Sequence, residues 1–276
     1  DSTHPGPERR SEFHGTTVPV VREDRTIAWF HEADGQTASF VQPSVERTEL
    51  PAKIEFTFIN HARESTECGH WNLYKLYDGE WFHLGPYLHT ADCRVLLPGG
   101  TKTWTMHGFH SAGFESREAT AFGHLGGGRY AAVAGYGHGT DTSAALVDLV
   151  ADPIEITPTD DITAEHSNGT VTVTSPLWED DEHPPSATLT VTRTDAATQR
   201  LIAEQVMTTR DVGSSHARFR GLRNTISFLD DGVETVVLRT DERVAENSVG
   251  YDSVVREYRI PSLNQAYRVE IDRGAG

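Results

Sequence analysis

The chain has 276 residues, and its 41 acidic and 24 basic residues give a net charge of −17. Two domains are expected, because a single domain usually contains about 100 to 200 residues. A surface this acidic repels phosphate groups, so we expect no nucleic-acid partner.

The basic residues are mainly arginine, since the lysines are limited to Lys53, Lys75 and Lys102. Carboxylate-rich, lysine-poor surfaces are typical of extreme halophiles, because such surfaces stay hydrated when salt screens their charge strongly. The alternative is an acidic surface that attracts a cation or a basic partner. Because the acids are spread along the whole chain rather than gathered in blocks, salt adaptation of an archaeal type is favoured.

Several features favour an extracellular or cell-surface protein. No apolar run approaches the roughly 20 residues of a membrane helix, so no membrane-spanning segment is expected. The chain begins at Asp1 rather than Met, as a processed chain or a trimmed one would. Two cysteines and the Asn168-Gly169-Thr170 acceptor suit secretion and glycosylation of Asn168. The same Asn-Gly pair is equally typical of a hairpin turn.

Short runs of alternating or β-branched residues, separated by Gly, Pro, Asn and Asp, recur along the chain. This pattern is typical of a β-sandwich rather than of alternating strands and helices. Residues 1–16 are interpreted as a polar tail and residues 17–152 as a first domain. Its predicted strands are Thr17–Val21, Ala28–His31, Lys53–Asn60, Trp71–Tyr77, Glu80–Leu84, Lys102–Met106, Arg129–Tyr136 and Ser143–Val150.

The clearest local pattern is a hairpin that turns at Asp78-Gly79, a pair that supplies the positive φ angles of a two-residue turn. Pairing of Tyr77 with Glu80 would bring Cys68 close to the chain a few residues before Cys93. A Cys68–Cys93 disulfide is therefore favoured over two free thiols or half of a metal site, provided that the protein is exported. Such a bond closes a loop of about 25 residues and is worth roughly 3 kcal/mol of stability.

A domain boundary is expected near Ala151–Thr163, where prolines and acidic residues interrupt the strand pattern. A second β-rich domain follows over residues 162–276. Leu222–Leu229 has the apolar spacing of a short helix, and Gln199–Thr209 is ambiguous between strand and helix. The predicted strands of this domain are a hairpin over Ile162–Ser175 and the runs Ala187–Arg193, Val233–Arg239, Val254–Ile260 and Tyr267–Ile271.

Four segments of the first domain carry turn and core residues in a particular order. They are Phe56–Asn60, Tyr74–Trp81, Leu97–Thr101 and Gly128–Val133. A strand ending in Asn precedes an Asp-Gly-x-Trp hairpin, a Pro-Gly turn starts the next strand, and a Gly-x-Tyr strand follows. Together they resemble an immunoglobulin-like family of exported bacterial and archaeal proteins. The resemblance implies a sandwich of seven or eight strands with no catalytic residues to carry over.

The fold class expected for the whole chain is therefore all-β, with two tandem β-sandwich-like domains. The first is expected to be immunoglobulin-like, and the second to be β-rich with a possible short helix. The resemblance does not extend to the second domain or to the long histidine-rich loop at residues 106–128.

Histidines are frequent in the later part of the first domain. His107 and His110 form a His-x-x-His pair in a Gly-rich loop, and His124 and His138 follow. Imidazoles from neighbouring loops would suit Zn²⁺ or Cu²⁺. A pair in a loop nevertheless lacks the fixed geometry of a helical His-Glu-x-x-His motif. The loop 106–128 is thus a candidate metal- or glycan-binding loop, although lysine-poor chains also use histidine as ordinary polar surface.

Signs of catalysis are weak, so we expect no enzyme and no required cofactor. The sequence has no Gly-x-Ser-x-Gly motif, and carboxylate pairs such as Asp180-Asp181 are expected solvated groups in so acidic a chain. The glycine run Gly123–Gly128 lacks the Lys-Ser/Thr ending of a phosphate loop. If exposed, four aromatic residues would serve as a carbohydrate platform, namely Trp71, Trp81, Tyr87 and Trp104, but in a sandwich such residues are more often core.

The sequence therefore favours a non-catalytic, exported structural protein of the cell surface or extracellular space. As a filament or coat subunit, it would add its N-terminal segment, residues 16–21 or the tail before them, as a strand to a neighbour. The expected partners are further copies of the chain or other surface proteins. The alternatives are a metal- or glycan-binding module that uses the loop 106–128 and, less favoured, a secreted hydrolase.

Overall fold

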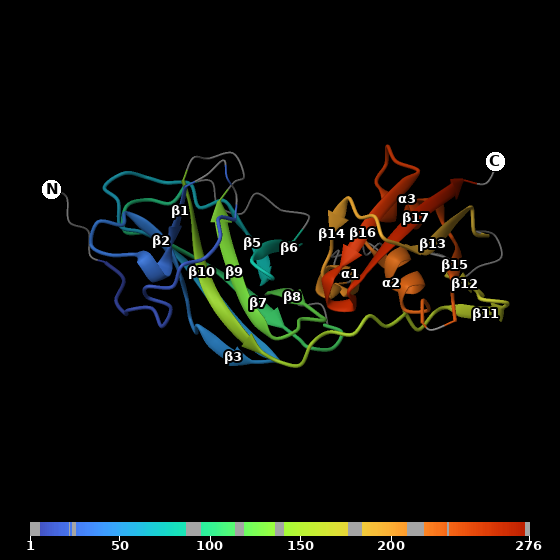
Figure 1. Cartoon of the computed structure of the whole chain (residues 1–276). Coiled ribbons are helices and arrows are strands. Elements are labelled where there is room, and N and C mark those ends of the chain that lie inside the picture. Colours follow the sequence, from blue (N-terminus) through green and yellow to red (C-terminus); the bar gives the residue numbers. More distant parts are fainter. Residues whose placement is uncertain are drawn as a thin grey trace. The chain divides into compact units, whose positions relative to one another are not determined.

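The computed structural model describes residues 6–21, 23, 26–86, 95–113, 119–135, 141–175, 184–208, 218–230 and 232–273. Two compact units make up the chain, unit 1 at Asp1–Pro153 and unit 2 at Ile154–Gly276. The division falls within the segment where the sequence predicts a boundary. Strands dominate both units, as the predicted all-β class requires (Figure 1).

Unit 1 contains two sheets. Sheet A has the strand order β1-β10-β9-β5-β6, with β3 also paired to β10, and sheet B has the order β2-β4-β7-β8. The strands of sheet A are β1 (Thr26–Trp29), β3 (Arg47–Glu49), β5 (His70–Tyr77), β6 (Glu80–Gly85), β9 (Gly128–Gly135) and β10 (Asp141–Val150). Those of sheet B are β2 (Ser39–Pro43), β4 (Ala52–Asn60), β7 (Thr101–Gly108) and β8 (Thr120–Phe122).

The two sheets of unit 1 pack face to face around aromatic side chains. Phe56 of sheet B lies 5.4 Å from Trp71 of sheet A between ring centroids, and Trp71 lies 5.9 Å from Phe122 of sheet B. The strands β10-β9-β5-β6 of sheet A therefore face β2-β4-β7 of sheet B in a two-sheet sandwich. Trp71 and Trp104 are buried in this unit, so they belong to its core and form no exposed platform.

The predicted hairpin of β5 and β6 is confirmed. Tyr77 pairs with Glu80, and the turn residues Asp78 and Gly79 have φ angles of 49° and 77°. These are the left-handed values that a two-residue turn demands between twisted strands. The register shifts once, between Leu73 and Tyr74.

Unit 2 is built on one mixed sheet in the order β11-β12-β15-β13-β17-β16-β14. Apolar residues of α2 and α3, such as Leu222 and Val249, share a core with strand residues such as Leu189 and Val236. Its strands are β11 (Thr163–Ser167), β12 (Thr170–Thr174), β13 (Ala187–Thr194), β14 (Gln199–Arg200), β15 (Thr235–Thr240), β16 (Val255–Ile260) and β17 (Gln265–Arg273). Its helices are α1 (Ala203–Met207), α2 (Arg220–Ile226) and α3 (Glu242–Val249).

Unit 2 is more helical than the sequence predicts. The predicted helix exists as α2, while the ambiguous segment Gln199–Thr209 divides into β14 and α1. The sequence does not predict helix α3. Its eight residues carry a buried apolar stripe of only Val244, Ala245 and Val249, which is too short to show a helical period. The core of unit 2 therefore lies between a sheet and helices rather than between two sheets. None of the described helices has the length and apolar character needed to cross a membrane.

The predicted strand Thr17–Val21 is wrong. These residues have no strand assignment and pair with none of the described strands. The first strand begins later, at Thr26, and runs parallel to β10. Instead, Val18, Pro19 and Val21 contact side chains of sheet A.

Candidate functional site

The described residues contain no group of three or more His, Cys, Asp or Glu side chains that could hold a metal ion. His107 stands opposite Lys53 in the pairing of β7 with β4, which places a cation on the same face. The Nδ1 atom of His110 lies 3.2 Å from the carbonyl oxygen of Leu125. His138 lies outside the described residues, so the site with His107, His110, His124 and His138 stays a prediction.

The backbone near the predicted disulfide is paired in the part of the chain that the structure describes. Thr66 and Leu96 exchange hydrogen bonds of 3.0 and 2.7 Å, which brings together chain positions close in sequence to Cys68 and Cys93. Cys68 is fully buried. Cys93 lies outside the described residues, and the Cys68–Cys93 pair stays a prediction.

The glycosylation acceptor lies at an exposed turn. Asn168 and Gly169 connect β11 to β12 with φ angles of 47° and 77°, so the Asn-Gly pair does form the hairpin turn. The Asn168 side chain is exposed. Its glycosylation stays a prediction.

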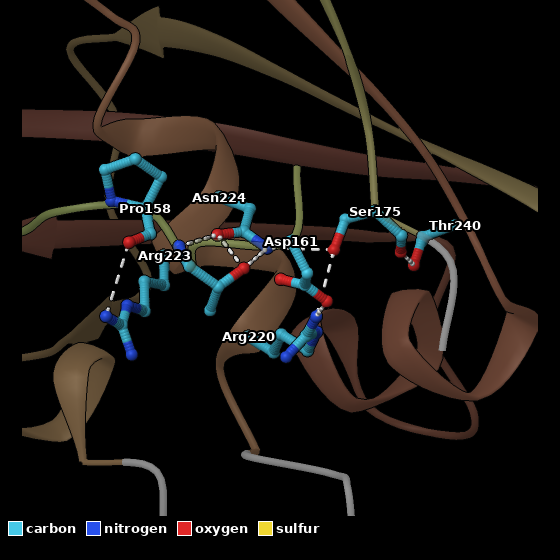
Figure 2. Close-up of polar contacts among 8 residues, drawn as sticks. Pro158, Asp161, Ser175, Arg220, Arg223, Asn224 and Thr240 are labelled. Carbon is cyan, nitrogen blue, oxygen red and sulfur yellow. Dashed lines mark hydrogen bonds and ion pairs between the residues drawn. The ribbon is translucent and has the colours of Figure 1, made fainter. Parts of the chain in front are cut away.

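A buried polar cluster in unit 2 joins the segment Thr157–Asp161 to α2 (Figure 2). Asn224 is fully buried and stands at its centre. The Asn224 Oδ1 atom accepts the backbone amide of Thr159 at 2.8 Å, and its Nδ2 atom donates to the Thr159 hydroxyl at 2.8 Å. The same Nδ2 atom donates to the buried Ser175 hydroxyl at 3.1 Å. One side chain thus fastens the entering segment to both a helix and a strand end.

Two arginines of α2 extend this attachment. Arg223 Nε donates to the carbonyl oxygen of Thr157 at 2.7 Å, and Arg220 forms an ion pair with Asp161. Burial and the charge of Arg220 lower the pKa of Arg223, and the guanidinium nevertheless stays protonated, as arginine does in proteins. Burial alone would raise the pKa of Asp161, but a hydrogen bond from Thr159 and the Arg220 charge outweigh it and lower that pKa.

The cluster around Asn224 is suited to holding the chain rather than to catalysis. In the interactions that the structure gives it, Ser175 Oγ accepts from Asn224 and Arg220, and neither group can act as its general base. Arg220 and Asp161 neutralise each other in an ion pair. The cluster therefore works as a clamp that fixes the start of unit 2 onto α2.

A groove in unit 1 is also lined by charged groups that pair with each other. It has a volume of about 560 Å³ and is lined in part by Arg47, Gly128, Arg129 and Asp148. Arg129 donates two hydrogen bonds to the Asp148 carboxylate, at 2.9 and 3.0 Å. This bidentate pair satisfies both groups internally, so neither is poised for acid–base chemistry.

The N-terminal segment, defined as residues 6–21, is anchored to unit 1 through a buried carboxylate. The side chain of Glu46 is only 1% exposed. Arg9 Nη1 lies 3.1 Å from its Oε2 atom, the backbone amide of Glu12 donates to the same oxygen at 3.0 Å, and the Ser11 hydroxyl donates to Oε1. Burial of a carboxylate is costly unless such partners compensate it. Every one of these three donors comes from the N-terminal segment.

The N-terminal segment also covers an apolar surface of sheet A. We call this surface the outer face, formed by Trp29, Tyr74, Trp81, Ala131, Val133, Ala144 and Leu146. Phe13 packs into this cluster, and Val18 and Val21 lie against it. The alternate residues of β9 and β10 face the sandwich core, so both sides of these central strands are apolar. An antiparallel sheet normally leaves one side to water.

Polar contacts fix the position of the segment on the outer face. The Trp81 indole N–H donates to the carbonyl oxygen of Pro19 at 2.9 Å. The Arg129 guanidinium lies 4.6 Å from the centre of the Phe13 ring, within the range of a cation–π contact. The segment is therefore matched to the outer face by shape, by hydrogen bonds and by charge.

The continuous apolar runs at 130–134 and 144–147 are the sequence signal for this surface. A strand with one solvated side alternates apolar and polar residues, whereas a strand buried on both sides does not. These runs indicate that something must cover both sides of the sheet. They do not indicate which segment covers the outer face.

His31 forms a further contact with the N-terminal segment. It is 2% exposed, and its Nε2 atom donates to the carbonyl oxygen of Thr16 at 3.0 Å. Its Nδ1 atom is buried without a hydrogen-bond partner among the described residues. Burial lowers the pKa of His31, although the nearby charge of Glu32 partly offsets this effect. The neutral ring is therefore the form that fits this site.

We expect the Asn224→Ala substitution to destabilise unit 2 by roughly 2 kcal/mol, because it leaves the Thr159 amide without its acceptor and removes one of the two donors to the buried Ser175 hydroxyl. Urea unfolding of the whole chain measures this loss. The matched control is Asn247→Ala on α3, expected to change stability by less than about 0.5 kcal/mol. Equal effects of the two substitutions would contradict the clamp.

We expect acid to weaken the attachment of the N-terminal segment through His31. Its pKa in the folded protein is below the unfolded value of 6.5, so the folded state binds fewer protons. The stabilisation is therefore complete above about pH 6.5 and is lost as the pH falls through the folded pKa. Unfolding free energies at pH 7.5 and 5.5 should differ less in His31→Gln, which keeps an N–H donor, than in the parent chain.

The exposed His166 on β11 of unit 2 provides the control for this pH effect, because it lies outside unit 1. The His166→Gln variant should keep the loss of stability that the parent shows between pH 7.5 and 5.5. A His31→Gln variant with the same pH dependence as the parent would show that His31 does not carry the effect.

No protein-family model matches this chain, and no curated protein matches it significantly. The function proposed below therefore rests on the residues and contacts of the chain itself.

Proposed function

We propose that this protein is a non-catalytic, exported structural protein that self-associates at the cell surface or in the extracellular space through its N-terminal segment. The observation that carries the proposal is the apolar outer face of sheet A, which residues 6–21 cover. Because a separate segment shields this face of the sheet, the same face can bind an equivalent segment of another copy.

The chemistry of the chain supports an exported, salt-adapted protein. The net charge of −17 keeps the surface hydrated in strong salt, where screening also reduces repulsion between copies. A Cys68–Cys93 disulfide and a glycan on Asn168 both belong to this proposal, since each requires export. The first domain's likeness to exported immunoglobulin-like proteins points the same way.

The mode of association differs from strand addition. The N-terminal segment forms no strand with the described sheets, so it is not built as an edge strand for a neighbour. It covers the face of a sheet through side chains. Val20, within this segment, is 69% exposed and adds an apolar contact that a neighbouring copy would bury.

We expect sedimentation velocity to show oligomers whose fraction rises with protein and salt concentration. Val20→Asp should weaken association at least about tenfold, because burying an unpaired charge in an interface costs more than 1.4 kcal/mol. The matched control is Tyr251→Asp in unit 2, where Tyr251 is 68% exposed. A chain that stays monomeric at every salt concentration would contradict the proposal, as would equal weakening by both substitutions.

A further inference from the structure

We infer that the outer face of sheet A is an acceptor site for the N-terminal segment of a second copy of this chain, so that copies associate by exchanging segments. This inference rests on the proposed self-association and names its partner and its binding surface. The surface is the one formed by Trp29, Tyr74, Trp81, Ala131, Val133, Ala144 and Leu146.

The first argument concerns the need for a cover. Removing the N-terminal segment would expose the apolar outer face to water and would leave Glu46 without the donors that Arg9, Ser11 and Glu12 provide. Both consequences are unfavourable, since apolar surface and an uncompensated carboxylate each cost free energy. If the N-terminal segment of one copy detaches, binding the segment of another copy therefore lowers the free energy of the uncovered outer face.

The second argument concerns which segment fits. The outer face accepts an aromatic ring beside Arg129, a carbonyl oxygen opposite the Trp81 indole, and a cation beside Glu46. The N-terminal segment supplies these groups as Phe13, Pro19 and Arg9. Another copy of the chain offers the identical set at the identical spacing. Exchange thus replaces each of these contacts by its equal, while the exposed Val20 adds a new apolar contact between the two copies. Such swapping is a low-cost route to oligomers.

The third argument concerns release. The N-terminal segment pairs with none of the described strands, so no ladder of backbone hydrogen bonds holds it in place. Its attachment depends on side-chain packing and on polar contacts to Pro43, Glu46, His31 and Trp81. Opening therefore breaks a limited set of interactions rather than a cooperative sheet.

Reciprocal exchange closes a dimer, while donation from each copy to the next builds a filament.

The test replaces Val20 by the photo-crosslinking residue p-benzoylphenylalanine in the full chain. Val20 is exposed and adjoins Pro19, whose carbonyl oxygen accepts the Trp81 indole N–H, so the probe lies close to β6. Unlabelled and ¹⁵N-labelled protein are mixed in equal amounts under conditions where oligomers form, and are then irradiated. Mass spectrometry identifies the isotope on each side of every cross-link to the peptide that contains Trp81.

Segment exchange predicts that about half of the cross-links to the Trp81 peptide join one labelled and one unlabelled chain, as random pairing of equal pools requires. If these cross-links stay isotopically pure while oligomers form, segment exchange is refuted and self-association uses another surface. If no oligomers form at any salt concentration, both the proposed function and this inference fail.

Phe13→Ala provides a second readout that does not depend on the cross-linker. The ring is lost equally from the closed and the exchanged state, so the fraction of oligomers should stay within about twofold. Release should become at least about tenfold faster, because the buried ring no longer holds the segment on the outer face. Isotope mixing followed over time measures this rate. A large drop in the oligomer fraction without faster mixing would indicate an ordinary interface and would overturn the inference.

Discussion

The structure of unit 1 depends on covering both sides of one sheet. Strands β9 and β10 carry apolar residues on the core side and on the outer side, so the sandwich partner alone cannot shield them. The N-terminal segment supplies the missing layer. Its Phe13 ring fills the apolar surface, while Arg9, Ser11 and Glu12 compensate the buried charge of Glu46. A segment that looks like a polar tail is thus part of the fold of unit 1.

The same principle explains the start of unit 2. The segment Thr157–Asp161 has the composition of a linker, yet Asn224 and Arg223 hold its backbone and an ion pair holds its last residue. Buried amides and guanidinium groups are suited to this task, because they satisfy backbone groups that would otherwise lose their water. In both units, residues outside the regular elements are fixed by a few buried polar side chains. These clusters bind the chain itself.

Much of the fold follows from local sequence patterns. The turn at Asp78-Gly79, the hairpin of β5 and β6 and the helix at Leu222 depend on residues close in the chain, and the structure confirms them. The strand expected at Thr17–Val21 fails because its apolar residues serve a surface made by distant strands. Helix α3 is too short to show a clear period. The contacts of Glu46 and Asn224 join residues more than 30 positions apart, and composition does not reveal such pairs.

The most direct test of the covered outer face is amide hydrogen exchange by NMR in strong salt. The Glu12 amide donates to Glu46, the Thr16 amide to Phe13, and the Trp81 indole to Pro19. Each should exchange at least about tenfold more slowly than in an unstructured peptide of the same sequence. Exchange at the peptide rate at all three positions would contradict the central claim, because the N-terminal segment would then not lie on sheet A.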